Sequence, residues 1–112
     1  MSGRRWSLEA ARLLLPEVRE RTEAAVRKVE KLSAERDALA EGSPEHDDVD
    51  ARMRAAISLW IRQMEALGLD VKGLWLVDFD NGSGYYCWRW PESGLEHFHG
   101  YDEGFSARIR IQ

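Results

Sequence analysis

The sequence predicts an α+β fold, in which a long antiparallel helical hairpin with a short N-terminal helix packs with a small three-stranded antiparallel β-meander. Nine of the eleven aromatic residues lie after residue 73. The chain before that point carries many charges around apolar residues at helical spacing. At this length we expect a single domain, residues 1–112, with a helical part at 7–68 and an aromatic β part at 74–112.

The first expected helix is short and covers residues 8–15. Ser7 supplies an N-cap hydroxyl and Glu9 places an acid in the first turn, where both stabilise a helix start. Pro16 lacks the amide hydrogen that a helix interior needs, but it suits a first helical turn. We therefore expect a kink or a fresh helix start at Pro16, followed by a long helix to about Ala40.

The long helix carries the apolar stripe of a coiled coil. Its positions recur at alternating steps of four and three residues and are Val18, Thr22, Ala25, Val29, Leu32, Arg36 and Leu39. Only Thr22 and Arg36 interrupt its apolar character. Glu stands four residues from Arg or Lys on the other faces, which is typical of a solvated helix surface.

A second long helix is expected from about His46 to Leu67, after a turn at 41–45 that contains Gly and Ser-Pro. Its apolar stripe consists of Val49, Met53, Ala56, Ile57, Trp60, Met64 and Leu67. Two antiparallel helices joined by a tight turn form a helical hairpin. We interpret Trp60 and the methionines as core or interface filler.

The hydrophobic period changes after Gly73. Residues 74–79 and 85–90 are rich in strand formers and flank Asn81-Gly82, a pair that favours a hairpin turn because both residues tolerate positive φ. A third strand is expected at 95–99, and a last extended piece at 106–111.

Both faces of this sheet carry large apolar groups. Strand alternation places Tyr86, Trp88 and Trp90 on one face and Tyr85, Cys87 and Arg89 on the other, while Trp75, Val77 and Phe79 oppose Leu74, Leu76 and Asp78. The helices can cover one face. We expect a homodimer, with the helix seams, the sheet face or both contributing, because the second face needs a ligand or a second copy of the chain to cover it.

Composition excludes some partners and indicates a compartment. Sixteen Lys and Arg against twenty Asp and Glu give a formal net charge of -4, whereas nucleic-acid binding relies on an excess of positive charge. No apolar run is long enough to cross a membrane, and no signal peptide opens the chain. The single cysteine, Cys87, fits a reducing compartment, so we expect a cytoplasmic protein.

An ordered set of motifs carries a family resemblance. The segment from Ser7 to Val18 and two charged helices are followed by Gly73-Leu74, Val77-Asp78-Phe79, Cys87-Trp88-Arg89, Phe98-His99, Gly104-Phe105 and Arg108. With these motifs the chain resembles, over nearly its whole length, the bacterial domain-of-unknown-function 2203 family. The resemblance implies no particular activity, cofactor or partner. It points to Asp78, Cys87, Trp88, Arg89, His99 and Arg108 as the positions of a candidate ligand site.

Two binding sites are conceivable from the residue types. His97 and His99 share one face of a strand, and Asp102 or Glu103 would complete a two-His, one-carboxylate set for a divalent metal. The alternative interpretation makes His99 a hydrogen-bonded residue and leaves His97 partly exposed. No cofactor is predicted beyond such a metal.

The arginines of the β part favour an anion. Arg89 and Arg108, with His99 as a third donor, would bind phosphate or carboxylate, because forked guanidinium donors hold two oxygens at once. The simpler alternative pairs Asp78 with Arg89 and Glu103 with Arg108.

No catalytic motif is recognisable. Cys87 beside His99 would form a thiolate–imidazole pair, but neither a glycine-rich elbow nor a helix N-terminus stands behind the cysteine. The sequence therefore favours a non-catalytic interaction or scaffold module that self-associates, with helices or an aromatic sheet that bind a second copy or a protein partner. The alternative is a site for a small anion or a metal, built from Arg89, His99 and Arg108. Such a site would also fit an enzyme.

Overall fold

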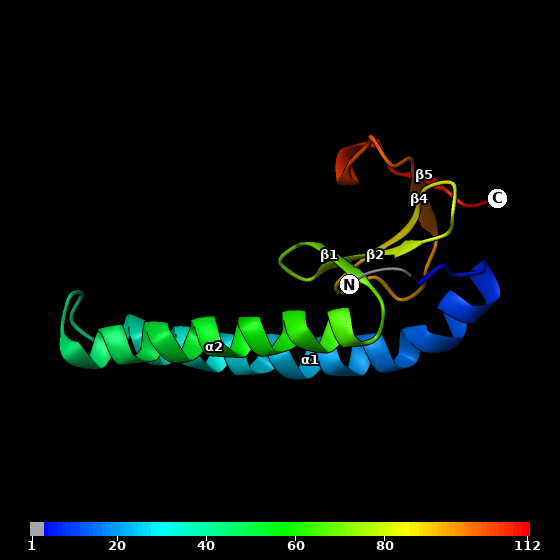
Figure 1. Cartoon of the computed structure of the whole chain (residues 1–112). Coiled ribbons are helices and arrows are strands. Elements are labelled where there is room, and N and C mark those ends of the chain that lie inside the picture. Colours follow the sequence, from blue (N-terminus) through cyan, green and yellow to red (C-terminus); the bar gives the residue numbers. More distant parts are fainter. Residues whose placement is uncertain (1–3) are drawn as a thin grey trace.

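The computed structural model describes residues 4–112 and contains two helices and one five-stranded antiparallel sheet (Figure 1). The elements in chain order are α1 (Leu8–Asp37), α2 (Pro44–Ala66), β1 (Asp70–Gly73), β2 (Leu76–Asp80), β3 (Tyr85–Arg89), β4 (His97–His99), the 3-10 turn η1 (Phe105–Ala107) and β5 (Ile109–Arg110). The helices lie side by side below the sheet, and η1 lies above it (Figure 1). The α+β class is therefore confirmed.

Helix α1 is continuous, so the predicted separate N-terminal helix is wrong. Ser7 caps it through a hydrogen bond from the Ala10 amide, and Pro16 lies inside it. Proline removes one backbone hydrogen bond. The packing of Leu15 and Val18, which are 5% and 0% exposed, holds the helix together on both sides of the proline. The first turns of α1 lean away from the rest in Figure 1, as a proline bend predicts.

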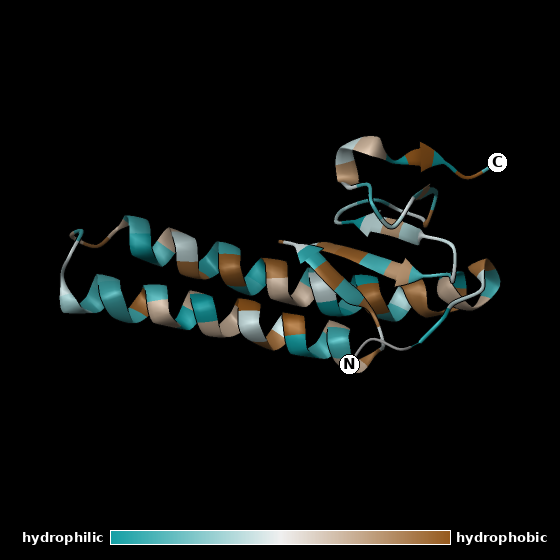
Figure 2. Cartoon of the chain, turned by 45° about the horizontal axis from the view of Figure 1, so that its top comes forward, coloured by the Kyte–Doolittle hydropathy of each residue, from teal (hydrophilic) through white to brown (hydrophobic). Residues whose placement is uncertain are grey.

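The two polar positions in the stripe of α1 have partners on α2. Thr22, which is fully buried, accepts a hydrogen bond of 2.8 Å from Trp60 Nε1. Arg36 Nη1 donates to Asp50 Oδ1 at 3.1 Å. These two contacts set the register of the helices, because sliding one helix by a turn would leave both polar groups unpaired. Apolar and polar residues alternate along both helices (Figure 2).

The sheet has five strands rather than the predicted three. Each strand pairs with its neighbour in the chain, in the order β1-β2-β3-β4-β5. Strand β1 was not predicted, and β5 falls within the extended piece expected near the end of the chain. Hydrogen bonds tie the N-terminal part of the chain to the β part: the Trp6 amide donates to the Asp80 carbonyl at 2.7 Å, and Arg12 donates to the Leu95 carbonyl through Nε at 3.2 Å and Nη2 at 3.0 Å.

The predicted first strand begins too early, because Leu74 and Trp75 form the turn between β1 and β2. Trp75 has φ of 62°, a left-handed conformation that costs a non-glycine residue about 1–2 kcal/mol. Its indole packs edge-on against Trp60 with ring centroids 4.9 Å apart. This aromatic contact offsets part of the backbone cost.

The two faces of the sheet differ in character. The inner face packs on the helices through Val77, Phe79 and Trp88, each 0% exposed. The outer face carries Asp78, Cys87 and other polar side chains. The sequence predicted that this face would need a ligand or a second copy to cover it. Instead, the segment after β4 folds back over it (Figure 1).

Candidate functional site

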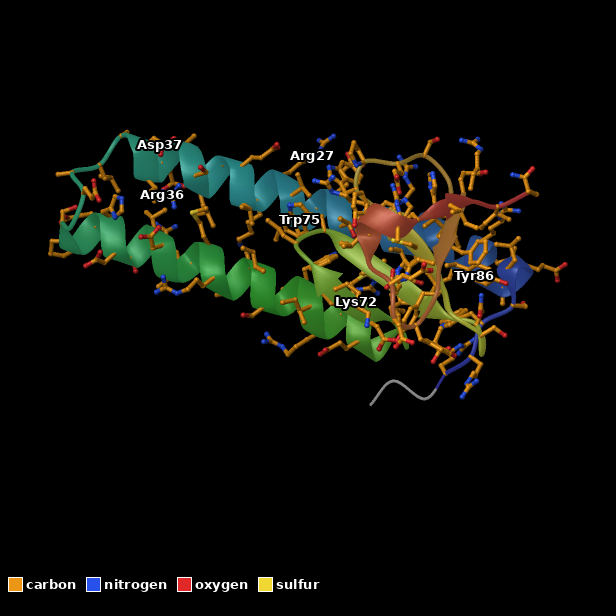
Figure 3. The ribbon with its side chains drawn as sticks, turned by 90° about the horizontal axis from the view of Figure 1, so that it is seen from above. Arg27, Arg36, Asp37, Lys72, Trp75 and Tyr86 are labelled. Atoms are coloured by element: carbon orange, nitrogen blue, oxygen red, sulfur yellow. The ribbon has the colours of Figure 1, made fainter. Side chains whose placement is uncertain are left out.

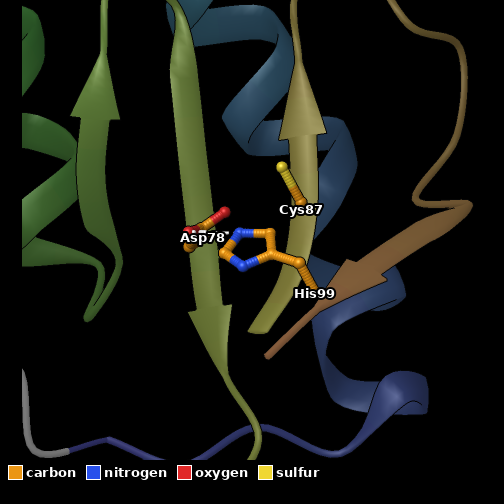
Figure 4. A group of neighbouring side chains, drawn as sticks. All are labelled: Asp78, Cys87 and His99. Atoms are coloured by element: carbon orange, nitrogen blue, oxygen red, sulfur yellow. Dashed lines mark hydrogen bonds and ion pairs between the residues drawn. The ribbon is translucent and has the colours of Figure 1, made fainter. Parts of the chain in front are cut away.

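Three neighbouring strands bring Asp78, Cys87 and His99 together on the outer face of the sheet (Figure 4). Asp78 lies directly opposite Cys87, and His99 lies opposite Tyr85, two residues before Cys87 on the same face. The three side chains, called here the buried triad, offer ligand atoms within 4.8 Å of one another. The residues are only 1%, 1% and 3% exposed.

The imidazole of His99 is held at both nitrogens. Nδ1 lies 2.9 Å from the Gly100 carbonyl and Nε2 lies 2.8 Å from Asp78 Oδ2. A carbonyl oxygen only accepts, so Nδ1 carries a hydrogen. One further proton therefore lies between Nε2 and the Asp78 carboxyl group.

Asp78 is a buried acid with one oxygen unused. Burial raises its pKa, although contact with the Cys87 thiol and with His99 acts in the opposite direction. Oδ2 bonds to His99, whereas Oδ1 has no hydrogen-bond partner among the described residues. An unpaired buried oxygen is uncommon in folded proteins and calls for a physical explanation.

Cys87 is held as a neutral thiol. Burial, followed by the adjacent Asp78 carboxylate, raises its pKa to about 12. A cysteine nucleophile needs the opposite shift, because the thiolate is the reactive form. The environment of Cys87 therefore suppresses nucleophilic chemistry at neutral pH.

Arg108 forms a two-pronged ion pair with Glu92 beside the buried triad. Its Nη1 and Nη2 lie 3.0 Å and 2.8 Å from the two carboxylate oxygens. Burial alone would raise the pKa of Glu92, but the hydrogen bonds from Arg108 and the Arg89 amide and the charge of Arg108 lower it. The expected pairs Asp78–Arg89 and Glu103–Arg108 are therefore wrong, because Asp78 bonds to His99 and Arg108 bonds to Glu92.

The three residues of the expected anion site do not converge on open space. Arg89 is exposed and its guanidinium lies 5.2 Å from the centre of the Phe105 ring. Arg108 is engaged by Glu92, and His99 by its own neighbours. Trp88, also in the candidate ligand site, is fully buried, and its Nε1 donates to the Glu92 carbonyl at 2.9 Å. An anion would have to displace Glu92 from Arg108.

The metal set expected from the sequence is not assembled. His97 turns toward Glu92, and its Nδ1 lies 4.0 Å from a Glu92 carboxylate oxygen. Glu103 accepts a hydrogen bond of 2.8 Å from the Gly100 amide, and Asp102 is exposed. In the described part of the chain, His99 is grouped instead with Asp78 and Cys87. Sequence spacing missed this group, because its members come from three different strands.

A second feature lies on the helices. An open groove of about 930 Å³, called here the helix groove, runs between α1 and α2. Its lining residues are Pro16, Glu17, Glu20, Arg21, Ala24, Ala25, Lys28, Leu32, Arg52, Ala55, Ala56, Leu59, Trp60 and Gln63. The adjacent alanine pairs at 24–25 and 55–56 were the available sequence signal, since small side chains leave room between helices.

Comparison with known families agrees with the resemblance seen in the motifs. The family described as Uncharacterized conserved protein (DUF2203) matches residues 4–111. Comparison with curated proteins and with solved structures gives no match. Among the described residues, no helix has both the length and the apolar character needed to cross a bilayer.

Proposed function

We propose that this chain, which belongs to the DUF2203 family, is a non-catalytic interaction module that self-associates through its helix groove. The observation that carries this proposal is the open groove between α1 and α2. Seen from above, the sheet covers one end of the helices and leaves the end with Arg36 and Asp37 uncovered (Figure 3). The uncovered part of the helices has room for a further layer.

The surface of the helix groove suits another helix. Ala24, Ala25 and Ala56 have small side chains that allow close approach of a backbone. Leu59 lies in the same groove and is 50% exposed, which is high for so large an apolar side chain. Contiguous exposed apolar surface is typical of interaction sites.

The charges around the helix groove match a second copy of the same chain. Glu17 and Glu20 precede the central alanines of α1, where Glu17 is paired with Arg21 at 2.9 Å and Glu20 supplies the further acidic charge, and Lys28 follows the alanines. Arg52 of α2 lies at the same end of the groove as Lys28, and its guanidinium also pairs with Asp48 at 3.1 Å and with Glu35 at 3.7 Å. A twofold axis near the alanines would place the acidic end of one copy against the basic end of the other, which is the self-complementarity that a symmetric dimer needs.

The proposed dimer is a four-helix assembly. In each copy the α1–α2 pair acts as an antiparallel coiled-coil hairpin, and two hairpins cover each other's grooves. The buried neutral thiol of Cys87 is compatible with the reducing cytoplasm, which we propose as the compartment. A protein partner would compete for the same groove.

The oligomeric state tests the proposal directly. Size-exclusion chromatography with light scattering is expected to give a dimer mass at tens of micromolar. Leu59→Arg is expected to weaken the dimer by at least about tenfold, because it places a charge in the apolar contact. Leu13→Arg is the matched control, since Leu13 is 77% exposed on α1 outside the helix groove. A monomeric wild-type chain would refute self-association.

A charge exchange tests the twofold arrangement. Glu17→Lys with Glu20→Lys places like charges together at both ends of the homodimer, and so does Lys28→Glu with Arg52→Glu. Each double variant alone is expected to be monomeric. An equimolar mixture is expected to form a heterodimer, since both ends then regain opposite charges. If the mixture stays monomeric while wild type is dimeric, the groove-to-groove geometry is wrong.

A further inference from the structure

The buried triad combines three types of metal ligand in one place. Asp78 on β2 offers a carboxylate oxygen, Cys87 on β3 a sulfur and His99 on β4 an imidazole nitrogen, all within 4.8 Å of one another. Sulfur and imidazole together select zinc-like transition metals over magnesium or calcium. These three ligands are buried in the sheet, whereas the exposed acidic residues of the chain lie on the protein surface.

The unpaired oxygen of Asp78 points to a ligand in the triad. Asp78 is 1% exposed, yet its Oδ1 has no hydrogen-bond partner among the described residues. The proton shared by Asp78 and His99 gives Oδ2 of Asp78 and Nε2 of His99 a hydrogen bond to each other. It leaves Oδ1 with no nearby donor in the described part of the chain other than the Cys87 thiol, which contacts the carboxyl group. A metal ion bound to both the carboxylate and the sulfur would satisfy that oxygen.

The orientation of His99 also favours a metal. Its Nδ1 donates to the Gly100 carbonyl at 2.9 Å, which leaves Nε2 directed at the triad. Metal-binding histidines usually donate their second ring N–H to a carbonyl or carboxylate in this way, and the bond fixes the ring and its tautomer. The backbone of Gly100 therefore prepares Nε2 to bind.

The charges near the triad permit a divalent ion. A carboxylate from Asp78 and a thiolate from Cys87 would neutralise two positive charges. Arg108 is the nearby cation: its guanidinium contacts the Cys87 thiol and is also bonded to both carboxylate oxygens of Glu92. Lys72 places its ammonium 4.6 Å from the centre of the Tyr85 ring on the same sheet.

We propose that Asp78, Cys87 and His99 bind one zinc-class divalent ion that joins β2, β3 and β4. Binding replaces the thiol proton of Cys87 and the proton shared by His99 and Asp78, so two protons leave as one ion enters. Because the ligands are buried, the ion is taken up as the sheet forms. The site is independent of the helix groove.

Cobalt is the probe, since it replaces zinc and reports its ligands by colour. Full-length chain is unfolded in urea with a chelator, freed of both and refolded with increasing Co²⁺. We expect saturation at one ion per chain, visible d–d bands and a near-ultraviolet band from thiolate-to-cobalt charge transfer. Absence of the charge-transfer band in the wild-type protein would overturn the proposal, whatever the variants do.

Variants assign the ligands. Cys87→Ser is expected to remove the charge-transfer band, and His99→Gln to weaken cobalt binding by at least about tenfold. His97→Gln and Asp102→Asn are matched controls from the same segment and should leave the spectrum unchanged. A band that survives Cys87→Ser, or that disappears in His97→Gln, places the ion elsewhere and overturns the assignment. Circular dichroism establishes that each variant has folded.

Discussion

The hydrogen bond between Thr22 and Trp60 offers the sharpest test of how the two helices are held in register. Both residues lie in the core, 0% and 1% exposed, and the bond length is 2.8 Å. Thr22→Val keeps the shape of the side chain but removes the acceptor. The indole N–H of Trp60 then stays buried without a partner, because Trp60 is only 1% exposed.

The size of the effect follows from this burial. An unsatisfied buried donor costs about 1–3 kcal/mol of unfolding free energy. For a chain of this size each kcal/mol lowers Tm by about 4 °C, so Thr22→Val is expected to lower Tm by roughly 4–12 °C. Thr22→Ser, which keeps the hydroxyl and loses one methyl group, is the milder control.

Urea unfolding of a double-mutant cycle isolates the bond. Thr22→Val, Trp60→Phe and the double variant are compared with wild type at one protein concentration, because dimerisation would otherwise shift the apparent stability. We expect a coupling of about 1–2 kcal/mol, since Trp60→Phe removes the donor that Thr22→Val leaves unpaired. Additive effects, with a coupling of less than about 0.3 kcal/mol, would refute the reasoning.

Three further predictions concern the β part. Gly84→Ala is expected to cost about 1–3 kcal/mol, because the new Cβ would lie 2.6 Å from the His99 carbonyl oxygen, whereas Gly104→Ala, with no heavy atom within 4 Å, should be nearly neutral in thermal unfolding. Cys87 in metal-free folded protein should resist a thiol reagent at pH 8 and react fully in urea; rapid labelling of the folded chain would contradict its burial and its pKa of about 12. The pKa of Glu92 in the folded chain lies below its ordinary value of 4.5. The ionised carboxylate therefore stabilises the fold above pH 4.5, and this stabilisation is lost as the pH falls through the folded pKa. Glu92→Gln should therefore lower stability at neutral pH and flatten the acid side of the urea-stability profile; an unchanged profile would contradict the Arg108 contact.

Hydrophobic periodicity and turn-forming residues predicted most of the helices and strands. The hairpin turn at Asn81-Gly82 and the pairing of the strands on either side of it are as predicted, although of these two residues only Gly82, at 93°, has a positive φ. Strand β1, Asp70–Gly73, escaped prediction because it is a short edge strand without strand-forming aromatics. Pro16 was interpreted as a kink or a fresh helix start, and the fresh start is wrong, since sequence alone does not reveal the packing that carries α1 across the proline.

The candidate site was predicted in its residues but not in its contacts. Alternation correctly placed Cys87 and Arg89 on one face. It did not predict that Asp78 would bond to His99 rather than to Arg89, because that choice depends on the register of β4 against β3. The Glu92–Arg108 pair depends on how the chain returns after η1, and no local pattern encodes that return.

The order of the sheet has a consequence for how the chain folds. Every strand pairs with the next one in sequence, and the two helices are also consecutive. Contacts between close segments form with little loop-closure entropy, which favours folding on the order of milliseconds or faster. Trp6 and Arg12, which bond to Asp80 and Leu95, instead join distant parts of the chain. We therefore expect the helical pair and the meander to form first, and the N-terminal segment to dock last and lock one onto the other.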